Sequence, residues 1–469
     1  MSVVSIPHTF RYARSSQLLD EQLSLVSADS SLPSVSHQVA TERSDKDFFS
    51  GRILRPRLIA RLLRSLMSIV QSRFHIPAAM LNRILLAADP LVTCSEERLR
   101  FEAFSACCGV YARIDMLPGS VDAPIHARGC TNVDFNSPML AALAMVRDSE
   151  KLRLTIGPSM LKVDRNETTV IEKKVPLPVR WIKGLVEVQA CQSRMACVHE
   201  VTGTEAWRFL RSLPRMKTNR RESFIVPAGK GLRLSQLDAR DSVRVGGLER
   251  LKVLEELAAE AKLLSIYSDQ TTGASAWKLQ FSDCCFWLVI SPEVWRGFSG
   301  EGQAISSLVN KRWEKIVNVV REELGWGAVV DEEEIHRKLA AKHSIDTEML
   351  RGALAALGTQ GLVGFDLGEG AWFHRPLPWS LDQVEKLQPR LRNARKILDE
   401  NKVRFGVGNE QEQIVLVNSS GVDHRVRFDP DWGAKCTCTW YAKHGVSRGP
   451  CKHILAAQIY IEELPDGHP

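Results

Sequence analysis

The chain lacks any apolar run long enough to cross a membrane. Its longest candidates, residues 140–146 and 284–290, have only the length of a buried strand or helix, whereas a membrane-spanning helix needs about 20 apolar residues. The N-terminus also lacks the charged and then apolar pattern of a secretory signal. We therefore expect a cytoplasmic protein that does not engage a membrane.

A disulfide framework and a phosphate-binding loop are missing as well. Eleven cysteines are an odd number, and the adjacent pairs Cys107-Cys108 and Cys284-Cys285 suit a reducing compartment. Neither the glycines around Lys230 nor those of residues 297–302 have the G-x-x-x-x-G-K-[ST] spacing with which backbone amides cradle phosphates. Any ATP hydrolysis would therefore belong to a partner.

What is present is the composition of a globular protein with mixed charge. The chain has 469 residues, of which 44% are hydrophobic and 25% charged, which is enough apolar side chains for roughly two to four domains. The net charge is +7, and residues 386–453 alone hold 13 Lys and Arg against 7 Asp and Glu. Such a basic region can attract the phosphates of DNA or RNA, although charged clusters are usually no more than solvated faces.

The C-terminal residues carry the one motif whose spacing dictates a chemistry. Cys436 and Cys438 are followed by twelve residues and then by Cys451 and His453. Three thiolates and one imidazole are the ligand set of a tetrahedral structural zinc, so we expect one closed Zn²⁺ site. A strand or tight turn before the gap and a helix over residues 451–460 would give a β-hairpin and a helix around the ion. The alternative is that the thiols are inert core residues and that His453 is an ordinary helix histidine.

This C-x-C…C-x-H order resembles the SWIM-type zinc finger. Together with Trp440-Tyr441 and Arg448-Gly449-Pro450, it resembles the bacterial SWIM proteins found beside MoxR-type AAA ATPases and von Willebrand factor A-domain proteins. The resemblance extends upstream over Phe48-Phe49-Ser50-Gly51, Arg100-Phe101-Glu102, Asn132-Val133-Asp134-Phe135, Arg180-Trp181-Ile182-Lys183-Gly184, residues 291–302 and Phe373-His374-Arg375-Pro376-Leu377-Pro378. It implies a zinc-binding, non-enzymatic protein whose activity the family leaves open. The implied partners are a MoxR-type ATPase and a von Willebrand A-domain protein, or DNA or RNA.

The pattern along the chain predicts an α+β, multidomain protein, because short β-branched runs alternate with helical ones between residues 89 and 290. We divide it into a disordered or loosely packed tail (1–47), a mixed α/β body (48–302), a winged-helix-like segment (303–380) and a basic helix with a β-rich domain (381–469) that ends in a ββα finger at about 424–462. Strands are predicted at 152–156, 168–171, 185–189, 242–245, 277–281 and 286–290, and helices at 138–146, 205–213 and 248–264.

The winged-helix prediction is based on the order of three helices, at 305–324, 331–343 and 346–357, followed by a hairpin over residues 362–375. The third helix would be the one that reads DNA. It has a single basic side chain, Arg351, whereas reading base edges needs several Arg, Lys, Asn or Gln residues. We therefore favour packing or protein docking for this segment.

A basic amphipathic helix is predicted over residues 54–69. Its apolar stripe includes Leu58, Leu62 and Leu66, and arginines line another face. Contact with a membrane surface or nucleic acid is one interpretation. We favour the other, a surface helix that covers the core.

Two further segments are candidate partner contacts. Residues 295–303 join Trp295, Arg296 and Phe298 to three glycines, and exposed Trp and Arg are typical of interface anchors. The alternative, which we favour, is a tight interdomain turn with a buried tryptophan. The other candidates lie on the basic helix near the finger, at Arg390, Arg392, Arg395 and Lys396.

One pair of residues has the appearance of a nucleophile and its base. Cys197 and His199 lie two apart in a predicted β region, where such residues simply share a face of the strand, and a metal site there would lack a fourth ligand. We therefore predict that the protein is not an enzyme.

Overall fold

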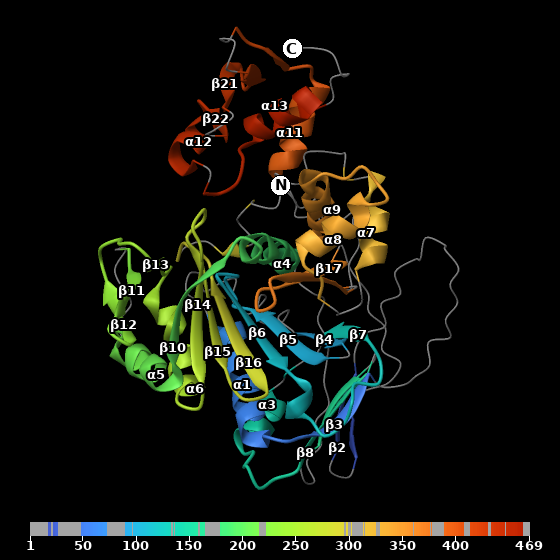
Figure 1. Cartoon of the computed structure of the whole chain (residues 1–469), viewed down its shortest axis with the longest axis vertical. Coiled ribbons are helices and arrows are strands. Elements are labelled where there is room, and N and C mark those ends of the chain that lie inside the picture. Colours follow the sequence, from blue (N-terminus) through green and yellow to red (C-terminus); the bar gives the residue numbers. More distant parts are fainter. Residues whose placement is uncertain are drawn as a thin grey trace.

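The structure is a computed structural model of the whole chain (Figure 1). It describes residues 17–19, 22–26, 48–72, 90–95, 97–132, 135, 137–157, 160–164, 179–214, 222–294, 297–298, 302, 313, 315–324, 329–359, 361–375, 377, 389–407, 413–429, 433–445 and 447–462. The architecture is α+β. We call the described part of residues 48–377 the body and residues 389–462 the C-terminal module.

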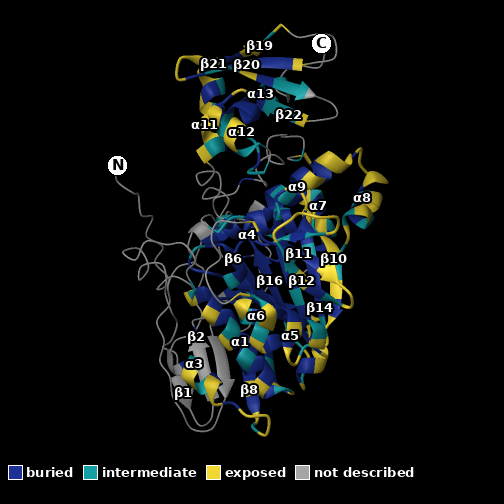
Figure 2. Cartoon of the chain, turned by 90° about the vertical axis from the view of Figure 1, so that its left-hand side faces the viewer, coloured by how far each residue is buried: buried dark blue, intermediate teal, exposed yellow. Residues whose placement is uncertain are grey.

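An eight-stranded antiparallel sheet is the centre of the body, in the order β10-β14-β15-β16-β6-β5-β4-β7. Its strands are β4 (Leu91–Ser95), β5 (Arg98–Phe104), β6 (Val110–Met116), β7 (Gly129–Asn132), β10 (Ala196–Thr202), β14 (Leu263–Asp269), β15 (Ala274–Gln280) and β16 (Cys284–Ile290). The inner strands are buried on both faces, whereas the edge strand β10 is mostly exposed (Figure 2). Polar side chains on the inner strands therefore have to find partners inside the protein.

Two smaller sheets flank this one. The five-stranded sheet has the order β1-β2-β9-β8-β3, with β1 (Gln17–Leu19), β2 (Gln22–Val26), β3 (Phe49–Ile53), β8 (Leu152–Ile156) and β9 (Met160–Asp164). The three-stranded sheet contains β11 (Phe224–Ala228), β12 (Gly231–Ser235) and β13 (Val243–Arg244). Strands β1 and β2 come from the segment 1–47 that the sequence predicts as a tail.

Helix α1 (Pro56–Gln71) forms where the sequence predicts an amphipathic helix, and proline at its first position suits a helix start. Its apolar stripe packs against β5 and β6. On the basic face, Arg61 pairs with Glu260, and Arg57 lies 3.6 Å from Asp148. The helix therefore covers the core, as we favour from its pattern. The other helices of this part are α3 (Ser137–Ala144), α4 (Val179–Gln192), α5 (Gly203–Ser212) and α6 (Lys252–Ala258).

Three helices and a hairpin follow: α7 (Val317–Glu323), α8 (Glu332–Ala340), α9 (Thr347–Thr359), β17 (Val363–Asp366) and β18 (Ala371–His374). Asp331 caps α8 by accepting a hydrogen bond from the Glu334 N–H. The order of the elements is the predicted one, and the winged helix itself stays a prediction. Buried residues of these elements belong to the same hydrophobic core as the sheet, and α9 and β17 pack against α4.

The C-terminal module has a hydrophobic core of its own and stands at one end of the molecule (Figure 1). Its elements are α11 (Pro389–Asp399), β19 (Val403–Phe405), β20 (Gln413–Ser419), β21 (Val422–Asp429), β22 (Gly433–Cys436), α12 (Thr439–His444) and α13 (Lys452–Glu462). The four strands form one antiparallel sheet in chain order. Helices α11 and α13 pack against each other beside it.

Two predicted elements are wrong. Residues 185–189 lie inside α4, not in a strand. Within this run, Leu185, Val186 and Val188 are buried, which fits a helix as well as a strand. The periodicity of so short a run does not distinguish the two. The helix predicted at 248–264 ends at Ala258, because Leu263 already pairs in β14. The strand predicted at 168–171 lies outside the described residues.

No helix among the described residues combines the length and the apolar character that a membrane span requires.

Candidate metal centre

Four side chains from separate local structures meet at the end of β22. Cys436 is the last residue of β22, and Cys438 caps α12 by accepting from the Tyr441 N–H. Cys451 directly precedes α13, and His453 lies in its first turn. The ligand atoms of all four residues lie within 4.8 Å of one another. The spacing in the sequence has therefore become a cluster in space.

The chain returns to the cluster through two glycines. Gly445 has φ 52° where α12 ends, and Gly449 has φ 71° two residues before Cys451. Residues with a side chain rarely adopt a backbone conformation with positive φ, whereas glycine adopts it without strain. These turns allow a gap of twelve residues to contain a short helix and still bring Cys451 beside Cys438.

The geometry fits a tetrahedral zinc. The distance from Cys436 Sγ to His453 Nδ1 is 3.8 Å, and two atoms bound to one tetrahedral zinc at the usual bond lengths would lie ~3.6 Å apart. All four residues are buried. Nε2 of His453 is also buried and has no hydrogen-bond partner among the described residues, so either ring nitrogen is available to a metal.

Backbone N–H groups surround the three sulfurs. The Cys438 N–H donates to Cys436 Sγ (3.4 Å), the Tyr441 N–H to Cys438 Sγ (3.3 Å) and the Ile454 N–H to Cys451 Sγ (3.4 Å). Hydrogen bonds of this kind stabilise the thiolate over the thiol. Each sulfur is thus prepared to carry negative charge.

The sulfurs cannot all carry that charge alone. A thiol hydrogen bond with Cys436 lowers the pKa of Cys451 to about 4, and the same bond raises the pKa of Cys436. Burial raises the pKa of Cys438. One thiolate therefore suppresses ionisation of its neighbours, and a divalent cation is the partner that allows all three to ionise.

Residues 425–461 match the family model of the SWIM zinc finger. The chain carries a SWIM zinc finger. Its cluster of Cys436, Cys438, Cys451 and His453 suits one structural zinc ion. The finger is a β-hairpin (β21 and β22) with two helices rather than the single helix we expect from the sequence, because residues 439–444 form α12 between the two halves of the motif.

The other comparisons add little. No curated protein matches the chain in sequence. Among solved structures, the chain is similar to the proliferating cellular nuclear antigen of Entamoeba histolytica, with 10% sequence identity and a TM-score of 0.34 over 53% of this chain and 100% of that chain. A likeness of this size carries no argument about fold or function.

Two other histidines lie near the SWIM finger in sequence but outside the cluster. The ring of His424 stacks on the ring of His453 at 4.0 Å between centroids. His444 lies 3.1 Å from a guanidinium nitrogen of Arg448 and against the ring of Trp440. His424 thus covers a ligand, and His444 ends helix α12 between the ligand pairs.

Arg390 braces the SWIM finger from α11. Its Nη1 donates to the carbonyl oxygens of Arg448 (2.7 Å) and Pro450 (3.0 Å), just before Cys451. Its guanidinium carbon lies 5.0 Å from the ring centroid of Trp440. A side chain at Gly302 would collide with the same guanidinium. Arg390 therefore joins the segment after β16 to the finger, and a role of this residue in binding a partner stays a prediction.

The segment 295–303 is likewise built into the protein where the structure describes it. Phe298 is fully buried, and its N–H donates to the Cys108 carbonyl (2.8 Å). Any side chain at Gly297 would collide with the backbone of Cys107 and Cys108. Phe298 is therefore an internal anchor rather than an exposed contact, and the interpretation as a tight turn fits. Trp295 and Arg296 lie outside the described residues.

The remaining candidate contacts lie on α11 and differ in exposure. Arg392 and Lys396 are exposed, and Arg395 is half-buried. Lys396 has a side chain that is 73% exposed and lies 3.8 Å from Glu400. Their role in binding a partner stays a prediction.

Cys197 and His199 do not form a site with further ligands. Both lie on β10, with a bulge between them, and Cys197 is exposed. Burial of part of the side chain raises the pKa of the Cys197 thiol, which makes it a weaker nucleophile at neutral pH. Among the described residues, neither Cys197 nor His199 belongs to a group of potential metal ligands.

Sequence reasoning missed a second cluster, which we call the arginine cluster. It lies on β5, β6 and the hairpin and consists of Arg98, Arg100, Glu102, Arg113, Asp115, Asp366 and Arg375. Arg98 and Arg100 bind Asp366, Arg100 also binds Asp115 at 2.7 Å, and Arg375 binds Glu102. The available signal was charge of both signs at every second position of β5 and β6, which places Arg98, Arg100, Glu102, Arg113 and Asp115 on one face of the sheet.

Proposed function

We propose that this chain is a non-enzymatic interaction protein whose SWIM finger is a zinc-stabilised binding module. The observation that carries the proposal is the buried set of four donor residues. Three cysteines and one histidine fill the four positions of a tetrahedral zinc, and a catalytic zinc needs one position for water or substrate. The metal would then hold the finger together rather than react.

The partners would be a MoxR-type AAA ATPase and a von Willebrand A-domain protein, on the strength of the family resemblance in the sequence. A partner that hydrolyses ATP would supply an activity for which the sequence shows no phosphate-binding loop. The place of action would be the cytoplasm. In support, the odd number of cysteines and the adjacent pairs Cys107-Cys108 and Cys284-Cys285 suit a reducing compartment.

Affinity purification from the native host tests this proposal. The wild-type chain at low salt should recover the ATPase and the A-domain protein, and Cys438→Ser should lose both together with its zinc. Cys197→Ser is the matched control, because it removes an exposed thiol outside the zinc cluster. Recovery of neither partner by the wild type would contradict the proposed partners, and equal recovery by Cys438→Ser would contradict the role of the finger.

A second candidate function is binding of DNA or RNA. It is favoured by the exposed basic side chains of the C-terminal module, which include Arg392, Lys396, Arg425 and Lys443. Exposed Lys and Arg release counterions from nucleic acid on binding, so the affinity must fall as salt rises.

Titration with duplex DNA, single-stranded DNA and RNA at several salt concentrations tests this candidate. Replacement of both Arg392 and Lys396 by alanine should weaken binding and reduce the salt slope by about 1 for each phosphate that the variant no longer binds. Arg240→Ala is the control, because Arg240 is 96% exposed but lies in the body. Binding without a salt slope, or an equally weakened control, would rule out this function.

A further inference from the structure

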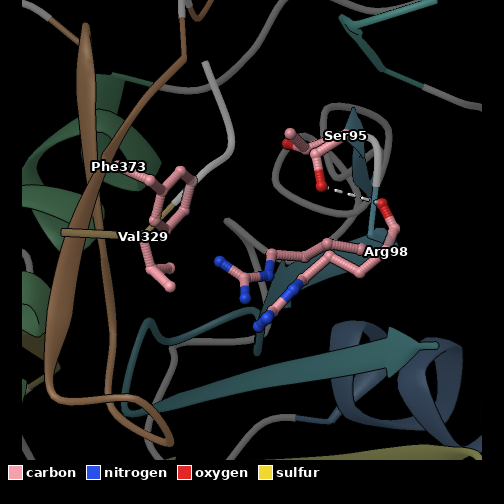
Figure 3. A pocket seen from close by; sticks show the side chains of 6 residues that line it. Ser95, Arg98, Val329 and Phe373 are labelled. Carbon is pink, nitrogen blue, oxygen red and sulfur yellow. Dashed lines mark hydrogen bonds between the residues drawn. The ribbon is translucent and has the colours of Figure 1, made fainter. Parts of the chain in front are cut away.

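A small pocket lies between the eight-stranded sheet and the β17–β18 hairpin, within the body rather than the SWIM finger (Figure 3). It is lined by Thr93, Ser95, Arg98, Arg100, Val329 and Phe373. One wall is polar and comes from β4 and β5. The other wall is apolar, and Figure 3 shows Val329 and Phe373 on the side of the space opposite Ser95 and Arg98.

Strand register aims the polar wall into this space. Thr93 pairs with Arg100, and Ser95 pairs with Arg98, across β4 and β5. Residues that are directly opposite on neighbouring strands, and residues two apart on one strand, point to the same face of a sheet. Two hydroxyl groups and two guanidinium groups therefore share one face beside the pocket.

Among the described residues, the buried charges around the pocket do not balance. The arginine cluster contains four arginines and three carboxylates, which leaves one positive charge in excess. Glu369 lies 3.7 Å from Arg98 Nη2, but its side chain is 53% exposed, so water screens its charge. A buried charge without a full partner is strongly destabilising. An anion at this place would relieve the imbalance.

One of the two arginines that line the pocket, Arg98, keeps a donor for such an anion. Arg98 uses Nη1 for Asp366 and Nη2 for Glu369, and its Nε is buried without a hydrogen-bond partner among the described residues. Arg100 uses Nε for Asp115 and Nη2 for Asp366. Its guanidinium carbon lies 4.8 Å from the ring centroid of Phe373, which fixes its plane beside the pocket.

We propose that this pocket binds a small monovalent anion, of the size of chloride or of a carboxylate group, between Arg98 and Arg100. The space is small, with room for about one water-sized group, so a nucleotide does not fit, and the single surplus positive charge favours a monovalent anion over phosphate. The ligand supplies the missing negative charge. The Ser95 hydroxyl donates to the Arg98 carbonyl oxygen (3.3 Å) and the Thr93 hydroxyl lies 3.5 Å from Cys130 Sγ, so the guanidinium groups carry the binding. The site is independent of the zinc cluster.

The test uses the full-length, zinc-loaded protein at constant ionic strength, with sodium methanesulfonate as the bulky background salt. Chloride and acetate are each titrated while thermal unfolding is followed, and calorimetry measures the binding directly. A ligand that binds only the folded protein gives a rise in Tm that follows its binding curve. We expect a saturable rise with chloride or acetate and none with inorganic phosphate.

Two variants and one control locate the effect. Arg98→Gln removes a donor and should weaken binding by about tenfold or more, as expected for the loss of a charged hydrogen bond. Val329→Phe fills the pocket from its apolar wall, leaves every ion pair in place and should abolish binding, with the fold checked by circular dichroism. Arg52→Gln is the control, because Arg52 pairs with Asp122 at the surface, and it should bind as the wild type does.

The proposal is overturned if neither chloride nor acetate gives a saturable effect on the wild type. It is also overturned if the effect is equal in the wild type, Val329→Phe and Arg52→Gln, since that is a general salt effect. Tighter binding of phosphate than of chloride and acetate would contradict the assigned size and charge of the ligand.

Discussion

The protein buries chargeable side chains in two places, and the two are compensated in opposite ways. In the body, the arginine cluster brings together fixed charges of both signs, and its ion pairs link β5 and β6 to the hairpin. In the SWIM finger, the zinc cluster gathers three thiols and an imidazole, with no carboxylate or guanidinium among them. The first cluster is stabilised mainly by its own members, whereas the second depends on a cation from outside.

This difference has a consequence for folding. An ion-pair network forms as soon as the strands that carry it are in register, so its stability belongs to the chain alone. A cluster of thiolates repels itself, so its free energy of binding zinc becomes free energy of folding. Loss of the metal should therefore act on one region, and loss of a single carboxylate on the other.

The largest expected effect is loss of zinc from the finger. Cys451→Ser or His453→Ala should abolish stoichiometric zinc binding, and the finger should unfold locally, because a structural zinc contributes on the order of 10 kcal/mol to small fingers. Metal analysis and hydrogen exchange measure the two results. Exchange in β5 and β6 should not change. Full zinc content in both variants would show that the ligands are wrongly assigned.

The next largest effect is expected in the body. Asp366→Ala leaves Arg98 and Arg100 without their shared carboxylate, and breaking a buried ion pair typically destabilises by ~3–5 kcal/mol. Urea unfolding should show this loss, and hydrogen exchange should show opening of the β17–β18 hairpin. Asp122→Ala is the control, because the surface pair of Asp122 with Arg52 contributes only ~0–1 kcal/mol. Equal effects of the two variants would show that the buried ion pairs of Asp366 contribute no more to stability than a surface pair.

As the pH falls, the SWIM finger and the body should lose stability at different pH values. Burial alone would raise the pKa of Asp366, but Arg113, Arg100 and Arg98 hold it well below its usual range. The stabilisation is therefore complete above the unfolded pKa of about 3.9 and is lost only as the pH falls below that value toward the folded pKa. In the finger, protons compete with zinc for the thiolates and the imidazole at higher pH.

We therefore expect zinc release and unfolding of the finger at a pH where the body remains folded. Near-ultraviolet circular dichroism, together with metal analysis after gel filtration at each pH, follows both events. Unfolding of both regions at the same pH would contradict the view that ion pairs stabilise the body and zinc stabilises the finger independently.

The smallest expected effect concerns Arg390. Arg390→Ala removes two hydrogen bonds to the carbonyl oxygens of Arg448 and Pro450 and should destabilise the finger by ~1.5–3 kcal/mol. Zinc should still bind, with faster loss to a chelator. Arg392→Ala, two residues further along α11, is the matched control and should stay within ~0.5 kcal/mol of the wild type. Identical rates of zinc loss in the two variants would show that Arg390 is not a brace.

Prediction from the sequence was best where the signal is local. The zinc cluster is encoded by residue types and spacing within 18 residues, from Cys436 to His453, and α13 lies close to its predicted place. Helix α12 was not predicted, because its six residues are too few to show the hydrophobic periodicity of a helix. The same limit explains why residues 185–189 were predicted as a strand.

The contacts of the candidate partner residues could not be predicted in this way. Phe298 and Arg390 belong to segments with the composition of an interface, and a buried internal contact needs the same large apolar and arginine side chains as an external one. Only the tertiary structure shows the internal contacts, of Phe298 with Cys108 and of Arg390 with Gly302.

By itself, the sequence determined the zinc finger, because four ligands with fixed chemistry lie close together in the chain. The tertiary structure alone decided the arginine cluster. Arg98 and Asp366 are separated by 268 positions, and nothing in the local pattern of either strand indicates the other. Charges at such a separation become partners only when long-range register places both on one buried face, where leaving either unpaired is strongly unfavourable.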